Sequence, residues 1–126
     1  MRIISFTVIL TILVIGFSWS SLKYLQTSSD EILRQLEAIE HQVHGEQWQE
    51  AQQSLAGIIA YWNEINKKWK FLIDHREIDE IEMTVARLQS AFQTREQNNA
   101  LTELSVLRFY LRHIPAKESL LLRNIF

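Results

Sequence analysis

The side chains of this chain that could do chemistry are concentrated in one acidic, histidine-containing stretch. Asp74, His75 and Glu77 lie within four positions of one another, and His113 joins them if the last predicted helix returns to the same end of the molecule. Imidazole and carboxylate side chains together suit a divalent transition metal, and they also act as general acid and base. One hypothesis is therefore a metal- or proton-responsive site built from Asp74, His75, Glu77 and His113.

The same residues have a simpler structural interpretation, which we favour. Asp74 followed by Glu77 has the spacing of a helix N-cap, and acids in a first turn complement the positive end of the helix dipole. The chain has no His-x-x-x-His pair, no glycine-rich phosphate loop, no Gly-x-Ser-x-Gly elbow and no cysteine. We therefore expect no enzyme, no catalytic residue, no cofactor and no bound metal, and no small-molecule substrate is indicated.

A heptad stripe of large apolar residues runs through the middle of the chain. Trp48, Leu55, Trp62 and Trp69 are spaced seven residues apart, and a second apolar row follows three positions after each of them. This pattern predicts one long amphipathic helix over 48–73, with the stripe as its core face. The spacing accounts for the tryptophans as core side chains, without a cofactor.

The segment before the stripe is predicted to be the first helix of a bundle. Ser28 and Glu31 have capping-box spacing, the apolar residues of 32–43 alternate by four and three, and Gly45 is expected to end the helix at the C′ position. Two possibilities stay open at Ser28. The helix begins there, or it continues uninterrupted out of the preceding apolar segment.

Two more amphipathic segments follow the stripe. Asp74 is expected to start a helix whose apolar face covers 78–92, and the next face covers 101–114. Pro115 is expected to end that helix, because the residue before a proline avoids the α region. The apolar tail 120–126 is predicted to be a short helix packing on the bundle or a docking segment for a partner.

The predicted fold class is all-α. Three glycines and one proline in 126 residues are too few turn residues for a β-rich fold, and short connections between amphipathic helices favour antiparallel neighbours. We predict an N-terminal transmembrane helix followed by an up-down antiparallel four-helix bundle. A tetratricopeptide-like helix-pair repeat is the alternative, because 48–51 resemble such a unit, although no repeat of that length recurs.

An uncharged apolar stretch begins with Ile3 and ends with Leu22. It is long enough to cross the hydrocarbon core of a bilayer, so we predict that it spans a membrane. Trp19, Lys23 and Tyr24 lie at its end, where aromatic and basic side chains mark the membrane interface.

Residues 1–25 are therefore predicted to be a transmembrane signal anchor, and residues 26–126 an extracytoplasmic helical domain. Arg2 precedes the span and favours an N-terminus inside the cytoplasm, which places the domain outside. The expected location is the cell membrane, as a single-pass protein. A cleaved signal peptide is the alternative, because small residues flank Trp19 where a peptidase could cut.

The stretch from Trp62 to Glu82 is similar to a known family. It contains the pattern W-x6-W-x2-LIDH-x-EIDEIE, and the later sequence around His113 and Pro115 is similar as well. The chain thereby resembles, over nearly its whole length, a bacterial membrane-anchored family described as domain of unknown function 4363. The resemblance implies a single anchor and a helical domain, without an established activity. Genes of that family often neighbour genes for small multi-pass membrane proteins, which implies a membrane partner.

The expected function is that of a non-enzymatic interaction or accessory protein that holds or regulates a membrane partner. An anchor with almost nothing on its cytoplasmic side cannot carry a signal inward alone. The candidate partners are the membrane itself, a multi-pass membrane protein and a second copy of this chain as a homo-oligomer. A net charge of −2 argues against nucleic acid. A metal- or proton-responsive domain at the Asp74, His75, Glu77 and His113 end is the alternative function.

Overall fold

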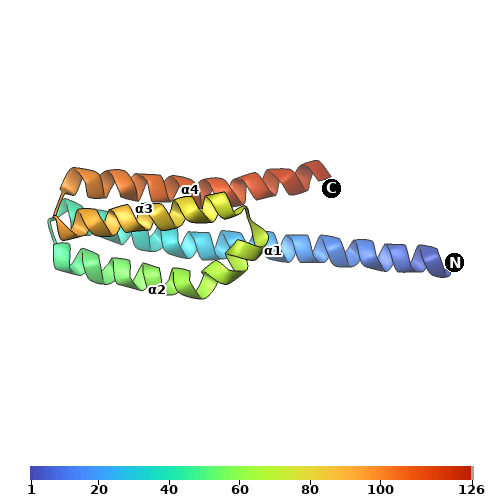
Figure 1. Ribbon diagram of the computed structural model, residues 1–126. Helices are drawn as coiled ribbons and strands as arrows, with labels where there is room; N and C mark the ends of the chain where they lie inside the picture. Colours follow the sequence, from blue (N-terminus) through green and yellow to red (C-terminus); the bar gives the residue numbers. More distant parts are fainter. Residues whose placement is uncertain (126) are drawn as a thin grey trace.

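The computed structural model describes residues 1–125, which form four helices and no strand. The helices are α1 (Arg2–His44), α2 (Trp48–Leu72), α3 (His75–Gln93) and α4 (Gln97–Ile125). They lie side by side, and the N-terminal part of α1 projects well beyond one end of the bundle (Figure 1). We call that end the stalk end and the opposite end of the bundle the distal end. The stretch 3–19 of α1, whose large apolar side chains are mostly exposed, is called the apolar stalk.

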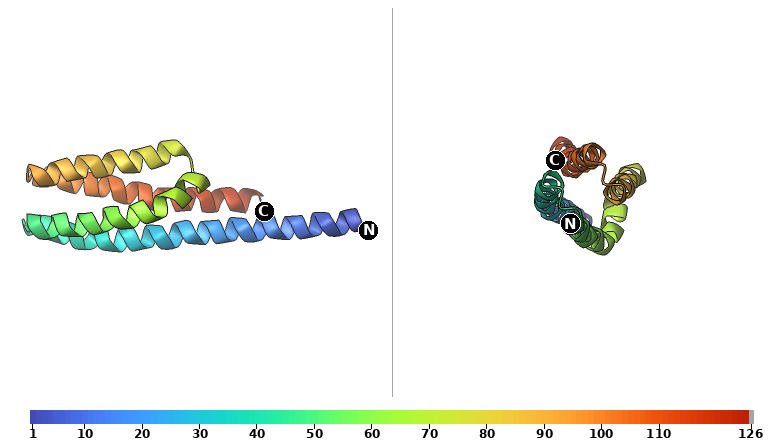
Figure 2. Two further views of the ribbon diagram at one scale, coloured as in Figure 1. Left: turned by 60° about the horizontal axis from the view of Figure 1, so that its bottom comes forward. Right: turned by 90° about the vertical axis from the view of Figure 1, so that its left-hand side faces the viewer.

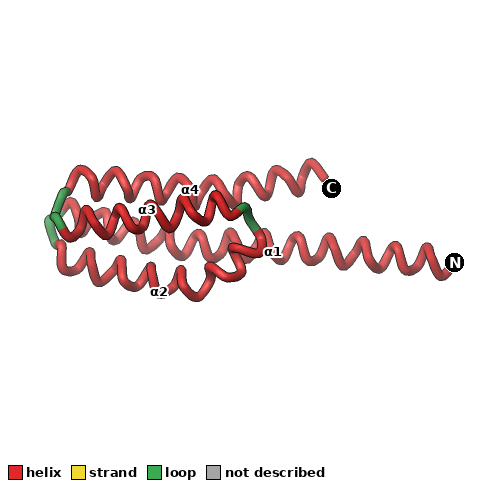
Figure 3. The backbone as a smooth tube through the Cα atoms, in the orientation of Figure 1, coloured by secondary structure: helices red, strands yellow, loops and turns green. Residues whose placement is uncertain are grey.

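The helices form an up-down bundle closed into a ring. Each helix packs against its neighbours along the chain, and α4 closes the ring by packing against α1. The end-on view in Figure 2 shows the four helices around a common axis. The connections are short, two at the distal end and one at the stalk end (Figure 3). The predicted four-helix bundle is confirmed, and this ring differs from a stack of helix pairs.

The core follows the heptad stripe of α2. Trp48, Leu55, Trp62 and Trp69 are all buried, and Trp69 has no exposed surface. The rings of Trp62 and Trp69 meet edge to face, with their centroids 5.4 Å apart. Full burial of one large aliphatic side chain contributes about 1.5–3 kcal/mol to the stability of the fold. The other three helices each supply several buried aliphatic side chains to this core: Ile32, Leu36, Ile39, Ile78, Ile81, Leu88, Leu104, Leu107 and Leu111.

α1 is one uninterrupted helix of 43 residues, about 65 Å long at ~1.5 Å per residue. It therefore continues through Ser28, and the capping-box spacing there does not mark a helix start. Ser28 is buried, and its hydroxyl donates to the carbonyl of Tyr24 at 2.7 Å. The apolar stalk and the first side of the bundle are thus parts of a single continuous helix.

α4 continues through Pro115 to Ile125, so the prediction that Pro115 ends the helix was wrong. Proline lacks the N–H that would donate to the carbonyl four residues earlier, here that of Leu111. The buried hydroxyl of Ser29 on α1 donates to this carbonyl instead. Residues 120–125 are accordingly the last turns of α4 and not a separate helix, and Phe126 lies outside the described residues.

The turn between α1 and α2 uses a different residue from the one expected. Gly45 has an ordinary φ of −82°, whereas Glu46 adopts the left-handed conformation, with a φ of 57°. The N–H of Gln47 donates to the carbonyl of Gln42 at 2.8 Å, which is the long bond of a Schellman motif. The prediction that Gly45 is the C′ residue was therefore wrong by one position. Arg95, with a φ of 54°, has the equivalent place between α3 and α4.

Candidate functional site

The acidic end of α3 is organised by capping and pairing. Asp74 accepts a hydrogen bond from the backbone N–H of Arg76 at 3.0 Å, which confirms it as the N-cap. Glu77 accepts from the ammonium of Lys117 on α4 at 2.8 Å. This hydrogen bond, together with the charge of Glu77, raises the pKa of Lys117. Glu77 therefore ties the part of α4 beyond Pro115 to the first turn of α3.

The two histidines at this end are both exposed. His75 is exposed in the first turn of α3. His113 is exposed on α4 and stacks on the ring of Phe109, with the centroids 5.3 Å apart and the planes 9° from parallel. Among residues 1–125, no three His, Asp or Glu side chains lie close enough together to hold a metal ion. The structure thus does not assemble Asp74, His75, Glu77 and His113 into a metal site.

The apolar stalk exposes large hydrophobic side chains on all sides. Ile3 is 81% exposed, Leu13 64% and Trp19 65%, and their neighbours are similar. Of the helices within residues 1–125, α1 is the one whose length and apolar composition suit a membrane span, and a signal sequence would meet the same criteria. The exposed stretch is shorter than the predicted span, because Leu22 is already buried in the bundle.

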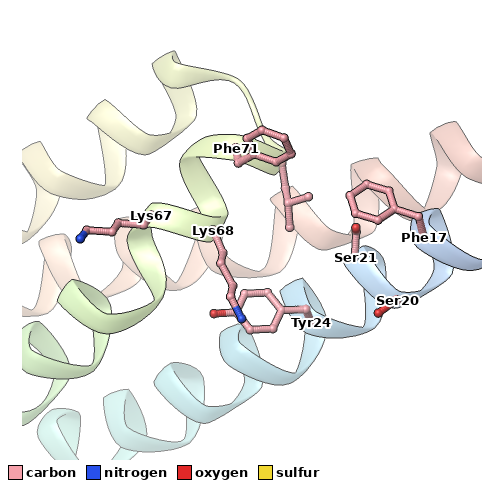
Figure 4. A pocket seen from close by; sticks show the side chains of 8 residues that line it. Phe17, Ser20, Ser21, Tyr24, Lys67, Lys68 and Phe71 are labelled. Atoms are coloured by element: carbon pink, nitrogen blue, oxygen red, sulfur yellow. The ribbon is translucent and has the colours of Figure 1, made fainter. Parts of the chain in front are cut away.

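Two grooves flank α1 where the stalk enters the bundle. The α1–α2 groove has a volume of about 520 Å³ and is lined by Phe17, Ser20, Ser21, Tyr24, Lys67, Lys68, Phe71 and Leu72 (Figure 4). The α1–α4 groove has a volume of about 700 Å³ and is lined by Trp19, Leu22, Lys23, Gln26, Ser119, Leu122 and Arg123. The residues predicted to lie at the membrane interface divide between them: Tyr24 lines the first, and Trp19 and Lys23 line the second.

The α1–α2 groove is apolar at one end and basic at the other. Because α1 and α2 are antiparallel, Phe17 on α1 and Phe71 on α2 both lie toward the stalk, whereas Tyr24 and Lys68 lie toward the bundle (Figure 4). The ammonium of Lys68 is 4.9 Å from the centroid of the Tyr24 ring, within the range of a cation–π contact. That contact turns the Lys68 ammonium toward α1.

Neither groove was predicted, although one signal for the α1–α2 groove was present. Lys67 and Lys68 stand immediately before Phe71 at the end of the heptad stripe, which places basic and exposed apolar side chains on neighbouring turns. The other wall of the groove belongs to α1. Only the packing of α2 against α1 shows that Phe17 and Tyr24 complete the groove.

The region that forms the bundle and both grooves corresponds to a known family. A family model described as Domain of unknown function (DUF4363) matches residues 19–125. The match begins at Trp19, so it takes in α1 from the end of the stalk onward and all of α2, α3 and α4. No curated protein and no solved structure matches the chain at a significant level. On the extent of this match, the chain belongs to the family Domain of unknown function (DUF4363).

Proposed function

We propose that this protein is a single-pass, membrane-anchored helical domain that acts without catalysis, outside the cytoplasm, by binding a partner in the membrane. The observation that carries the proposal is the continuity of α1 from the exposed stalk into the buried core. Leaving a Leu, Ile or Phe side chain in water instead of burying it costs about 1.5–3 kcal/mol of free energy. A stalk of such residues needs hydrocarbon around it, and a bilayer supplies that environment over this length.

The continuity of α1 also supports an interaction role. A helix with no break between stalk and bundle transmits a tilt or rotation of the span directly to the bundle. A multi-pass membrane protein, or a second copy of this chain, that binds the stalk would thereby reorient the bundle. The proposed orientation, with the N-terminus inside, follows from Arg2 at the start of the span.

The anchoring proposal is tested by fractionating the full chain after carbonate extraction. We expect it to remain in the membrane with the mass of the uncleaved chain. Leu13→Lys should weaken retention, because a lysine at the centre of a span costs about 2.5–3.5 kcal/mol, whereas Gln53→Lys on the exposed face of α2 should not. Release of the wild-type chain, or a shortened mass, would overturn the anchor.

Orientation and partner need separate measurements. Fusions of alkaline phosphatase and of green fluorescent protein to the C-terminus should give phosphatase activity without fluorescence, and the reverse result would overturn the orientation. A photo-cross-linking residue in place of Leu13 should capture a membrane protein or a second copy of the chain, and the same residue in place of Gln53 should not. Adducts with lipid alone at position 13 would contradict partner binding through the stalk.

A further inference from the structure

We propose that the α1–α2 groove binds one anionic phospholipid, with its phosphate beside Lys68 and its acyl chains along Phe17 and Phe71. The inference rests on the proposed membrane span, since that span places the groove at the level where lipid headgroups meet hydrocarbon. It goes further in assigning a specific ligand class to a defined set of side chains.

The polarity of the groove runs in the same direction as that of a lipid. Toward the stalk, the walls are Phe17 and Phe71, which are 60% and 82% exposed. Toward the bundle, the groove ends at Tyr24 and Lys68 (Figure 4). The hydroxyl of Ser21 lies on the α1 side between these two ends (Figure 4). An acyl chain from the bilayer would cover the two rings while its headgroup remained at the aqueous end.

The aqueous end of the groove carries two lysines that are not neutralised by an ion pair in the described part of the chain. Within residues 1–125, no carboxylate lies within ion-pair distance of Lys67 or Lys68. Lys70, two positions further on, differs, because it pairs with Glu82 at 3.6 Å. Among the described residues, Glu64, one turn before Lys68, is not within ion-pair distance of it. A phosphate group would complement the positive charge at this end. The Lys68 ammonium already lies there, beside the Tyr24 ring.

The two lysines have different parts in this arrangement. Figure 4 shows the ammonium of Lys68 beside the Tyr24 ring, at the inner edge of the groove, and that of Lys67 directed away from the groove. Lys68 is therefore the residue that would contact the phosphate, and Lys67 would add to the local positive potential. One lysine near an anionic lipid surface is worth about 1 kcal/mol, or about fivefold in binding, so the pair should contribute roughly 25-fold.

The α1–α4 groove provides a matched control. It lies on the opposite flank of α1 at the same level and carries two cations, Lys23 and Arg123. Replacing these two removes the same charge from the same end of the molecule. A lipid bound in the α1–α2 groove and a diffuse attraction to the basic end therefore predict different outcomes.

The experiment uses the full chain in phosphatidylcholine nanodiscs that contain a small fraction of a photoactivatable lipid. The probe is either phosphatidylglycerol or phosphatidylcholine, with the same diazirine near the headgroup, and adducts are mapped by mass spectrometry. In the wild type, the labelled residues should be Phe17, Ser20, Ser21 or Tyr24 on α1, or lie within 67–72 on α2, and they should react preferentially with the phosphatidylglycerol probe. Lys67→Gln/Lys68→Gln should lower that preference by about 25-fold, and Lys23→Gln/Arg123→Gln should leave it within about twofold.

Three results would overturn the inference. One is equal labelling of these peptides by both probes in the wild type, and another is the same loss of preference in both double variants. The third is labelling of α1 on its α4 side only. Lys67 and Lys68 are exposed, so both variants should keep the wild-type helical circular dichroism. Carbonate extraction separates the two proposals: a chain that stays in the membrane but shows no lipid preference disproves the lipid site alone.

Discussion

The Ser29 hydroxyl of α1 donates a hydrogen bond to the Leu111 carbonyl of α4, 82 positions away in the chain. This carbonyl is the one that Pro115 leaves without its intrahelical donor. Ser29 and Pro115 are both buried, so water does not replace the missing N–H. The bond from Ser29 thus satisfies the carbonyl that Pro115 leaves without a donor, at the point where α4 continues and brings Lys117 to Glu77.

The first prediction is that Ser29 and Pro115 are energetically coupled. Ser29→Ala leaves the buried carbonyl of Leu111 unsatisfied and should cost about 1–3 kcal/mol of unfolding free energy. In a Pro115→Ala background, the new N–H at position 115 donates to that carbonyl, so the same substitution should cost at least about 1 kcal/mol less. Urea unfolding of the full chain in detergent micelles, followed by circular dichroism, measures all four proteins of the cycle.

Ser105→Ala is the control for this cycle, because Ser105 is exposed on α4 and bonds only to its own helix, at the carbonyl of Leu101. Its cost should stay within about 0.5 kcal/mol in either background. Strictly additive costs for Ser29→Ala and Pro115→Ala would contradict the compensation described here.

A second prediction concerns the buried indole of Trp69, whose N–H donates to the Ser28 hydroxyl at 2.9 Å. Ser28→Ala removes the acceptor and leaves the indole N–H of a fully buried side chain unpaired. The expected loss of unfolding free energy is about 1–3 kcal/mol. Thr27→Ala, next to it on the exposed side of α1, should change stability by less than about 0.5 kcal/mol, and equal effects of the two substitutions would disprove the role of this bond.

The third prediction concerns the turn that ends α1, where Glu46 and not Gly45 has the left-handed conformation that glycine usually adopts. Glu46→Gly should stabilise the protein by about 1 kcal/mol, because a non-glycine residue in the left-handed region costs about 1–2 kcal/mol. Gly45→Ala should be neutral or slightly stabilising. Its φ is ordinary, and an added Cβ would come no closer than 3.5 Å, to the carbonyl oxygen of His41. Thermal melts of both variants test this, and a Gly45→Ala loss larger than any Glu46→Gly change would contradict it.

The fourth prediction is a pH dependence that depends on Lys117. Its pKa is raised in the folded protein by Glu77, so its contribution to stability is complete below the unfolded value of about 10.5 and is lost as pH rises through the folded value. Lys117→Met should therefore lower stability at neutral pH by about 1–2 kcal/mol, because Glu77, whose side chain is only 17% exposed, is left without its partner. The difference in unfolding free energy between the variant and the wild type should become smaller above pH 10.

Urea unfolding of both proteins between pH 7 and pH 11 checks this behaviour. Lys70→Met is the matched control, because Lys70 and its partner Glu82 are both substantially exposed, and exposed pairs contribute about 0–1 kcal/mol. If the difference in unfolding free energy between the wild type and Lys117→Met stays constant between pH 7 and pH 11, the pH dependence does not come from Lys117.

The local pattern of the sequence was sufficient to locate the helices and their buried faces, although not every helix end. The heptad spacing from Trp48 to Trp69 predicted a long helix with a buried stripe, because helical periodicity is a property of neighbouring residues alone. The cap at Asp74 was predicted for the same reason, since a cap bonds within its own first turn. The apolar stretch of α1 was recognisable as a candidate span from composition and length.

Other features were decided only when the helices packed. Ser28 looked like a cap but accepts from Trp69, and Pro115 looked like a helix end but is supported by Ser29. Asp74, Glu77 and the two histidines share an end of the bundle without forming a metal site, and the α1–α2 groove needs walls from two helices. The sequence by itself determined what depends on neighbours along one helix. Tertiary structure decided the rest, because each of those features depends on a donor, an acceptor or a wall supplied by another helix.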